Sequence, residues 1–137
     1  MKTKLVRANY DAEMGISEAV VRNKNGHFTG HALCHPKEEH PSNFAGCRIA
    51  EARAIINSVR YEKNVLNNEI KALQDFEKLL KNLKDYNPDS IEGRRLRRRI
   101  HELKAEKKAK REHIAAMKAA LNKTITERDE YFAQQQK

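Results

Sequence analysis

The densest set of like charges in the sequence is a basic run in its last third. The run opens with Arg94-Arg95-Leu96-Arg97-Arg98-Arg99 and continues through Lys104, Lys107, Lys108, Lys110 and Arg111. On a helix, which turns about 100° per residue, much of this run falls within one sector, while Glu102 and Glu106 fall on a different side. We call this sector the basic ridge, and its candidate binding residues are Arg94, Arg97, Arg98, His101, Lys104, Lys108 and Arg111.

A continuous row of cations at one-turn spacing suits a phosphate backbone, because each cation that neutralises a phosphate releases condensed counterions. Residues 91–137 carry fourteen Lys or Arg against seven Asp or Glu, whereas residues 1–43 and 44–90 each have a net charge of +1. No aromatic residues interleave the run, and no known DNA-binding motif surrounds it. We therefore expect any nucleic-acid binding to be largely independent of sequence. The alternative is a solvated face that is basic for solubility.

A second group of residues that could bind a metal lies between residues 31 and 47, from the expected second strand to the start of the first helix. His31, Cys34, His35, His40 and Cys47 are of the types that bind zinc, but no C-x-x-C pair is among them. Adjacent strand residues point to opposite faces, so Cys34 and His35 are not expected to act as a nucleophile and its base. We expect structural roles and no cofactor. A zinc site would have to draw on His31, Cys34, His40 and Cys47.

Other signs of catalysis are missing from the sequence. It has no glycine-rich phosphate loop, no G-x-S-x-G elbow and no H-E-x-x-H motif, so we expect no enzyme and no catalytic residues.

Charged residues make up 34% of the chain, which suits long helices that each bury one apolar stripe. No apolar run approaches the roughly 18 residues that span a membrane, and Met1–Lys4 does not begin an apolar signal segment. We therefore expect a cytoplasmic protein.

The first third of the chain predicts a small sheet. Ile16–Arg22 and His27–Cys34 are strand-like, and Asn25-Gly26 between them favours a hairpin turn. Residues 4–10 are a candidate third strand. A lone two-stranded hairpin is marginal in water, so we expect residues 1–43 to dock on the start of the following helix, where Gly46 permits a close approach.

The remainder, residues 44–137, predicts an antiparallel helical hairpin resembling a coiled coil. One helix runs from about Asn43 to about Asp85, and the second from about Ser90 to about Phe132. Pro88 breaks the pattern between them. The expected fold is thus mainly α, with the sheet and the hairpin forming one structural domain.

Apolar residues recur at seven-residue spacing on both helices and form a seam. The seam residues, through which we also expect a homodimer, are Ile56, Val59, Leu66, Ile70, Leu73, Leu80, Leu96 and Leu103. Its middle is polar, at Lys63, Lys107 and Lys110. Three lysines would not share a dry interface, so the helices splay there, the lysine stems reach out to water, or a partner supplies acids.

Two segments carry a resemblance to known proteins. In Gly30–Glu39 a short strand leads into a Cys-His-Pro-Lys-Glu turn, and Gly46–Ala54 contains Ile-Ala-Glu-Ala-Arg-Ala. This pattern is similar to small accessory proteins of phages and mobile elements of Gram-positive bacteria, although the His40-Pro41 stretch fits it less well. The resemblance implies a virus-encoded protein that acts inside a bacterial host cell. Such proteins often bind and disable a host complex, including defence nucleases.

These observations lead to one expected function and two alternatives. The leading hypothesis is a non-enzymatic binding protein whose basic ridge engages nucleic acid or a nucleoprotein complex of the bacterial host. In the phage setting this binding would inhibit a host defence or nucleic-acid-processing machine. The first alternative is a coiled-coil adaptor for protein interaction. The second is a multimer that captures an anionic nucleotide signal.

Overall fold

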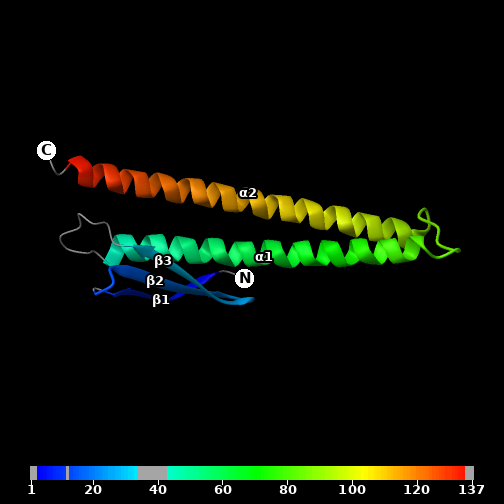
Figure 1. Ribbon diagram of the computed structural model, residues 1–137, viewed down its shortest axis with the longest axis horizontal. Helices are drawn as coiled ribbons and strands as arrows, with labels where there is room; N and C mark the ends of the chain where they lie inside the picture. Colours follow the sequence, from blue (N-terminus) through cyan, green and yellow to red (C-terminus); the bar gives the residue numbers. More distant parts are fainter. Residues whose placement is uncertain (1–2, 12, 34–42, 135–137) are drawn as a thin grey trace. The chain divides into compact units, whose positions relative to one another are not determined.

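The computed structural model describes residues 3–11, 13–33 and 43–134. The elements are three strands and two helices (Figure 1): β1 (Lys4–Asp11), β2 (Ile16–Asn23), β3 (Gly26–Leu33), α1 (Asn43–Lys81) and α2 (Ile91–Gln134). The expected mainly helical fold with a small N-terminal sheet is confirmed. Contacts divide the chain into two compact units. Unit 1 comprises residues 1–59 and 114–137, and unit 2 comprises residues 60–113.

The sheet in unit 1 is antiparallel, in the order β1-β2-β3. The candidate strand at residues 4–10 therefore does join the hairpin. The hairpin turn lies one residue earlier than the Asn25-Gly26 pair suggests, because Asn23 pairs with Gly26 and leaves Lys24 and Asn25 as the loop. Gly26 has a φ of 121°, which glycine adopts without steric cost, and it begins β3.

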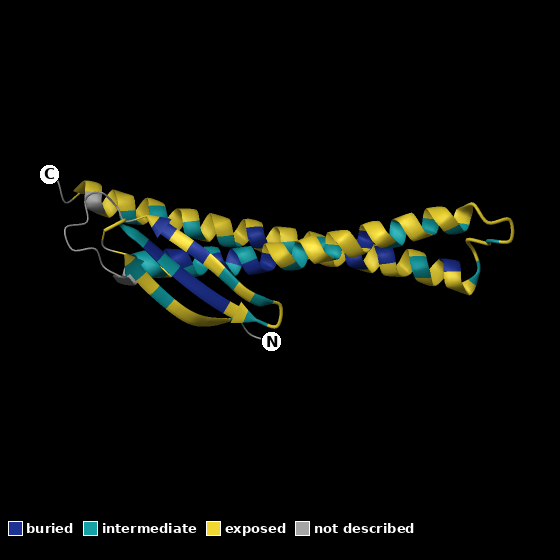
Figure 2. Ribbon diagram, turned by 60° about the horizontal axis from the view of Figure 1, so that its bottom comes forward, coloured by how far each residue is buried: buried dark blue, intermediate teal, exposed yellow. Residues whose placement is uncertain are grey.

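The sheet packs on the first part of α1, as expected. Ala19 and Ala32 form a buried cluster with Ile49 and Ala50, and buried residues concentrate on β2 and this part of α1 (Figure 2). Gly46 lies against the Ser17 side chain, which is the close approach that its missing side chain permits. The packing gives the short sheet the helical support that it needs in water.

Side chains of α1 also close one edge of the sheet. Arg53 Nη1 donates a hydrogen bond to the His31 carbonyl at 2.8 Å, and Asn57 Nδ2 donates to the Thr29 carbonyl at 2.9 Å. Both carbonyls belong to β3, an edge strand whose unpaired polar groups could otherwise pair with another chain. The two bonds also fix the position of β3 along α1.

Gly30 sets how closely β3 approaches α1, and we expect Gly30→Ala to lower the free energy of unfolding by about 2 kcal/mol. A Cβ atom at this position would overlap the Ala50 carbonyl oxygen and the Ala54 nitrogen, which are backbone atoms and cannot rotate away. Urea denaturation followed by circular dichroism measures the effect. Gly46→Ala is the control, because its new Cβ would meet the rotatable Ser17 hydroxyl and alanine favours the helix. Equal losses in the two variants would contradict this packing.

In unit 2, α1 and α2 run antiparallel on either side of the turn. α1 ends at Lys81, several residues before the expected end near Asp85, because its last turn tightens. Asn82 N and Leu83 N donate to the carbonyls three residues back, at 3.2 and 3.0 Å. Ser90 caps α2, because its hydroxyl oxygen accepts a hydrogen bond from Gly93 N at 3.2 Å.

The predicted seam residues pack between the chain's own helices. In unit 2, Ile70, Ile100 and Leu103 are buried, and Leu66, Leu73 and Leu96 pack against them. In unit 1, Ile56 and Val59 are buried against Ile114. Leu80, near the turn, is half-buried. The hairpin itself therefore covers most of the surface through which the sequence predicts a dimer.

The polar middle of the seam finds its partners within the chain. Lys110 Nζ lies 2.7 Å from Glu62 Oε2, and Lys107 Nζ donates to Asn67 Oδ1 at 2.7 Å. Lys63 is half-buried. The sequence leaves three possibilities open for these lysines. At Lys110 the third one holds, but the acid is Glu62 of α1 and does not come from another molecule.

Candidate functional site

The basic ridge lies on an exposed face of α2 in unit 2. All seven of its candidate residues are exposed: Arg94, Arg97, Arg98, His101, Lys104, Lys108 and Arg111. Their neighbours on the buried side are Ile100 and Leu103, which hold this face of α2 outward by packing on α1. The amphipathic pattern of the helix therefore fixes the direction in which the ridge points.

The ridge divides into two parts with different partners. Near the turn, Arg94 Nε donates to the Asp89 carbonyl at 2.8 Å, and Arg97 Nη2 donates to the Pro88 carbonyl at 2.7 Å. Arg97 also lies 3.5 Å from the Asp89 carboxylate. These two arginines thus help to hold the turn. Farther along, Lys104, Lys108 and Arg111 form no ion pair with any residue in the described part of the chain.

The second part of the ridge opens into a shallow cleft of about 350 Å³ between the two helices of unit 2. We call it the basic cleft, and its lining residues are Asn67, Ile70, Gln74, Lys104, Lys107, Lys108 and Arg111. The four cations stand at positions i, i+3, i+4 and i+7 of α2, so they share one face of the helix. The lining contains two carboxamides and no carboxylate.

This arrangement suits an anion with several charges along a line. Four cations over seven residues span about 10 Å of helix, and one DNA strand carries a phosphate about every 3.4 Å along its axis. The cleft thus matches about four consecutive phosphates, one for each cation. Carboxamide groups such as those of Asn67 and Gln74 can donate hydrogen bonds to phosphate oxygens.

The opposite flank of unit 2 has balanced charge. Arg99 Nη2 lies 3.5 Å from Glu69 Oε1, and Arg99 Nη1 lies 3.8 Å from Glu102 Oε2. Lys110 pairs with Glu62 on the same flank. Cations are therefore neutralised on one side of the hairpin and left without acidic partners at the cleft. This contrast distinguishes the cleft from a helix that is merely basic overall.

Sequence reasoning missed part of this site. It placed Lys107 in the basic run and in the middle of the seam but not among the candidate binding residues. It did not consider Asn67 or Gln74, which belong to the other helix. The signal that could have identified them was the antiparallel pairing itself, since folding the helices about Pro88 brings residues 67–74 opposite residues 104–111. Arg98 and His101 are exposed as expected but do not line the cleft.

The candidate zinc ligands do not come together in the part of the chain that the structure describes. Cys34 and His40 lie outside the described residues. His31 Nε2 lies 3.2 Å from Glu18 Oε2 on the neighbouring strand, and Cys47 is a half-buried free thiol. Among the described residues, no group of three or more His, Cys, Asp or Glu side chains is arranged to hold a metal ion.

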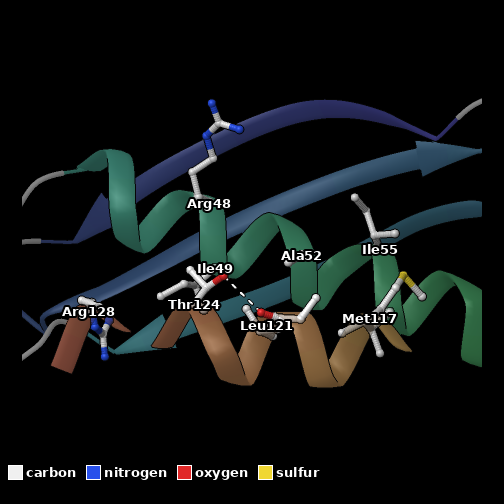
Figure 3. Close-up of a pocket in the computed structure, with 10 residues that line it drawn as sticks. Arg48, Ile49, Ala52, Ile55, Met117, Leu121, Thr124 and Arg128 are labelled. Carbon is white, nitrogen blue, oxygen red and sulfur yellow. Dashed lines mark hydrogen bonds between the residues drawn. The ribbon is translucent and has the colours of Figure 1, made fainter. Parts of the chain in front are cut away.

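Unit 1 contains a larger hollow of different character. A groove of about 620 Å³ lies between the first part of α1 and the last part of α2 (Figure 3). We call it the apolar groove, and its lining residues are Arg48, Ile49, Ala52, Ile55, Ile56, Met117, Ala120, Leu121, Thr124 and Arg128. Arg128 and Thr124 lie at one end, and Met117 and Ile55 at the other. Small alanines on both helices leave space that larger seam residues would fill.

We expect Ala120→Leu to stabilise the protein by about 1 kcal/mol, because the larger side chain fills part of the apolar groove. Thermal denaturation should show a melting temperature about 3–5 °C higher. Ala119→Leu is the matched control, since Ala119 is the adjacent exposed alanine and does not line the groove. An unchanged melting temperature for Ala120→Leu would mean that the larger side chain does not pack in the apolar groove.

Comparisons with other proteins add no further constraint on these sites. A scan against protein-family models matched none, and searches of curated proteins and of solved structures found no match. Among the described residues, neither helix has an apolar stretch long enough to cross a bilayer. What the basic cleft binds is therefore inferred from its own chemistry.

Proposed function

We propose that this is a non-enzymatic binding protein whose basic ridge engages the phosphate backbone of nucleic acid, alone or within a nucleoprotein complex. The observation that carries the proposal is the basic cleft, where four cations on one face of α2 have no carboxylate among their neighbours in the lining. Binding would neutralise several phosphates at once and release their counterions, which supplies most of the free energy of non-specific association.

The chemistry of the cleft also indicates what is recognised. Lys and Arg contact phosphates, which are alike at every step of a nucleic acid, and the lining has no aromatic side chain on which a base could stack. The binding that we propose is therefore independent of base sequence. Arg94 and Arg97, which bond to the turn, contribute less than Lys104, Lys107, Lys108 and Arg111.

Fluorescence anisotropy with labelled oligonucleotides tests this proposal. The protein should bind two duplexes of unrelated sequence with dissociation constants within about threefold of each other, because phosphate contacts carry no sequence information. It should also bind a single strand and an RNA hairpin. Failure to bind any of them at low salt would refute the proposal, and so would a strong preference for one duplex sequence.

An adaptor that binds protein is the second candidate, favoured by the apolar groove in unit 1. A pull-down from bacterial lysate, performed with and without nuclease, separates it from the first. Partners that are lost on nuclease treatment support nucleic-acid binding. Partners that persist after nuclease treatment and are lost in Ala120→Leu, which narrows the groove, support the adaptor.

The biological setting that we propose is a phage-encoded protein that acts on a defence or nucleic-acid-processing complex in a bacterial host. This part rests on the similarity of residues 30–54 to phage and mobile-element accessory proteins. A protein that coats phosphates without reading bases could compete with a host nuclease for its substrate. Protection of DNA from nuclease digestion by the purified protein would support this setting.

A further inference from the structure

The second half of α1 carries an apolar stripe that faces solvent. Val65, Phe76, Leu79 and Leu83 are 45%, 51%, 66% and 60% exposed, and Ala72 between them is also exposed. We call these five residues the second seam. All of them lie in unit 2, and none belongs to the cluster around Leu103 that joins α1 to α2 there.

The spacing of the second seam is that of a coiled coil. Val65, Ala72 and Leu79 are seven residues apart, and Phe76 and Leu83 follow Ala72 and Leu79 by four. Alternation of three and four residues places these side chains along one line of the helix, which is the pattern that packs against a parallel or antiparallel partner helix. α1 thus has two seams, and α2 covers one of them. A helix with two apolar seams belongs in a bundle of more than two helices.

We propose that the second seam is the interface of a homodimer, in which the α1 helices of two copies pack against each other to form a four-helix bundle. An interface of standard size buries about 800 Å² per partner, of which about 57%, or roughly 450 Å², is apolar. Four side chains that are about half exposed, together with Ala72, offer on the order of that area, since a fully exposed Phe offers about 150–250 Å² and Leu and Val offer somewhat less. A contiguous patch of this size is comparable to the largest apolar patch of a typical monomer, and such patches are often functional.

A second copy fits this surface better than a charged partner does. Between Val65 and Leu83, one position of this repeat is not apolar. It is Glu69, four residues after Val65, and its carboxylate is paired with Arg99 at 3.5 Å. The second seam therefore brings no unpaired charge to the interface, which would be costly to bury. In an antiparallel arrangement, Phe76 of one copy can also face Ala72 of the other, a large residue against a small one.

The proposed dimer leaves the basic cleft accessible. Glu69 and Glu62 pair with Arg99 and Lys110 on the flank that adjoins the second seam, whereas Asn67 pairs with Lys107 at the cleft on the other flank. A dimer would therefore present two basic clefts, and two linked sites bind one long nucleic acid more tightly than either alone. The dimer itself does not depend on that binding.

Sedimentation equilibrium of the full chain tests the proposal without any ligand. The wild type should be a dimer at micromolar concentrations, and Phe76→Glu with Leu79→Glu should raise the dimer dissociation constant at least about 100-fold. Leu33→Glu is the control, because Leu33 is 70% exposed on β3 and lies outside the second seam. Circular dichroism checks that helix content is unchanged, as expected for substitutions at exposed positions.

Each outcome of these measurements either supports or overturns the proposed homodimer. A dimer that dissociates in the Phe76→Glu, Leu79→Glu variant and persists in Leu33→Glu supports the proposal. A monomeric wild type overturns it, as does a dimer that survives the double substitution or is lost equally in Leu33→Glu. If the wild type is monomeric but binds anionic lipid vesicles only when the second seam is intact, the stripe belongs to a membrane surface and not to a second copy.

Discussion

Leu103→Asp should destabilise the protein by about 4 kcal/mol or more, the largest stability effect that we expect from one substitution. Leu103 is completely buried, and it packs with Ile70 and Ile100 at the centre of unit 2. Aspartate would leave a cavity and place a carboxylate where the described residues of this cluster offer only apolar groups. Because a domain of this size is stable by only about 5–15 kcal/mol, much of the hairpin would be lost.

Urea denaturation followed by circular dichroism measures this effect, and Ile91→Asp provides the matched control. Ile91 is 63% exposed in the first turn of α2, where an acidic side chain interacts favourably with the helix dipole. We expect Ile91→Asp to change the free energy of unfolding by less than about 0.5 kcal/mol. A Leu103→Asp protein as stable as the Ile91→Asp protein would contradict the packing of α1 on α2.

Lys104→Glu combined with Lys108→Glu and Arg111→Glu should weaken nucleic-acid binding about a thousandfold at moderate salt. The three residues line the basic cleft, are exposed, and form no ion pair among the described residues. Their reversal removes three phosphate contacts and adds repulsion. The fold should be unaffected, because none of the three packs in the buried clusters.

The control for charge alone is Arg95→Glu combined with Lys118→Glu and Lys123→Glu. These three residues are exposed on α2 outside the cleft, so the control variant has the same net charge as the cleft variant. Anisotropy titrations should show a loss of no more than about tenfold for the control. Equal losses would assign binding to the overall charge of the protein and remove the case for a specific cleft.

The sequence predicted the elements better than their ends. Seven-residue periodicity identified both helices, because burial of an apolar stripe is a strong and repeated constraint. The hairpin turn was displaced to Lys24 and Asn25, because glycine's positive φ is also accommodated at the first residue of a strand. The end of α1 at Lys81 was missed, because tightening of a last turn depends on local hydrogen bonds that periodicity does not report.

The candidate site was predicted on one helix only. Charge patterning located Lys104, Lys108 and Arg111 correctly on an exposed face. It did not distinguish them from Arg94 and Arg97, whose bonds to the carbonyls of Asp89 and Pro88 depend on the path of the turn. Contributions from α1 to the cleft, the apolar groove in unit 1 and the exposure of the second seam all depend on how two helices face each other. The pattern of residues along one helix does not show which residues of the other helix will lie opposite it.

The salt dependence of binding by the wild-type protein tests the central claim most directly. Four cleft cations that each neutralise one phosphate of duplex DNA predict that the logarithm of the binding constant falls with the logarithm of salt concentration with a slope of about −3.6 or steeper. The variant with Lys104, Lys108 and Arg111 reversed keeps only Lys107 of the four cleft cations, so its slope should be no steeper than about −0.9. A wild-type slope close to zero, or a slope that the three reversals leave unchanged, would contradict the assignment of the basic cleft as a phosphate-binding surface.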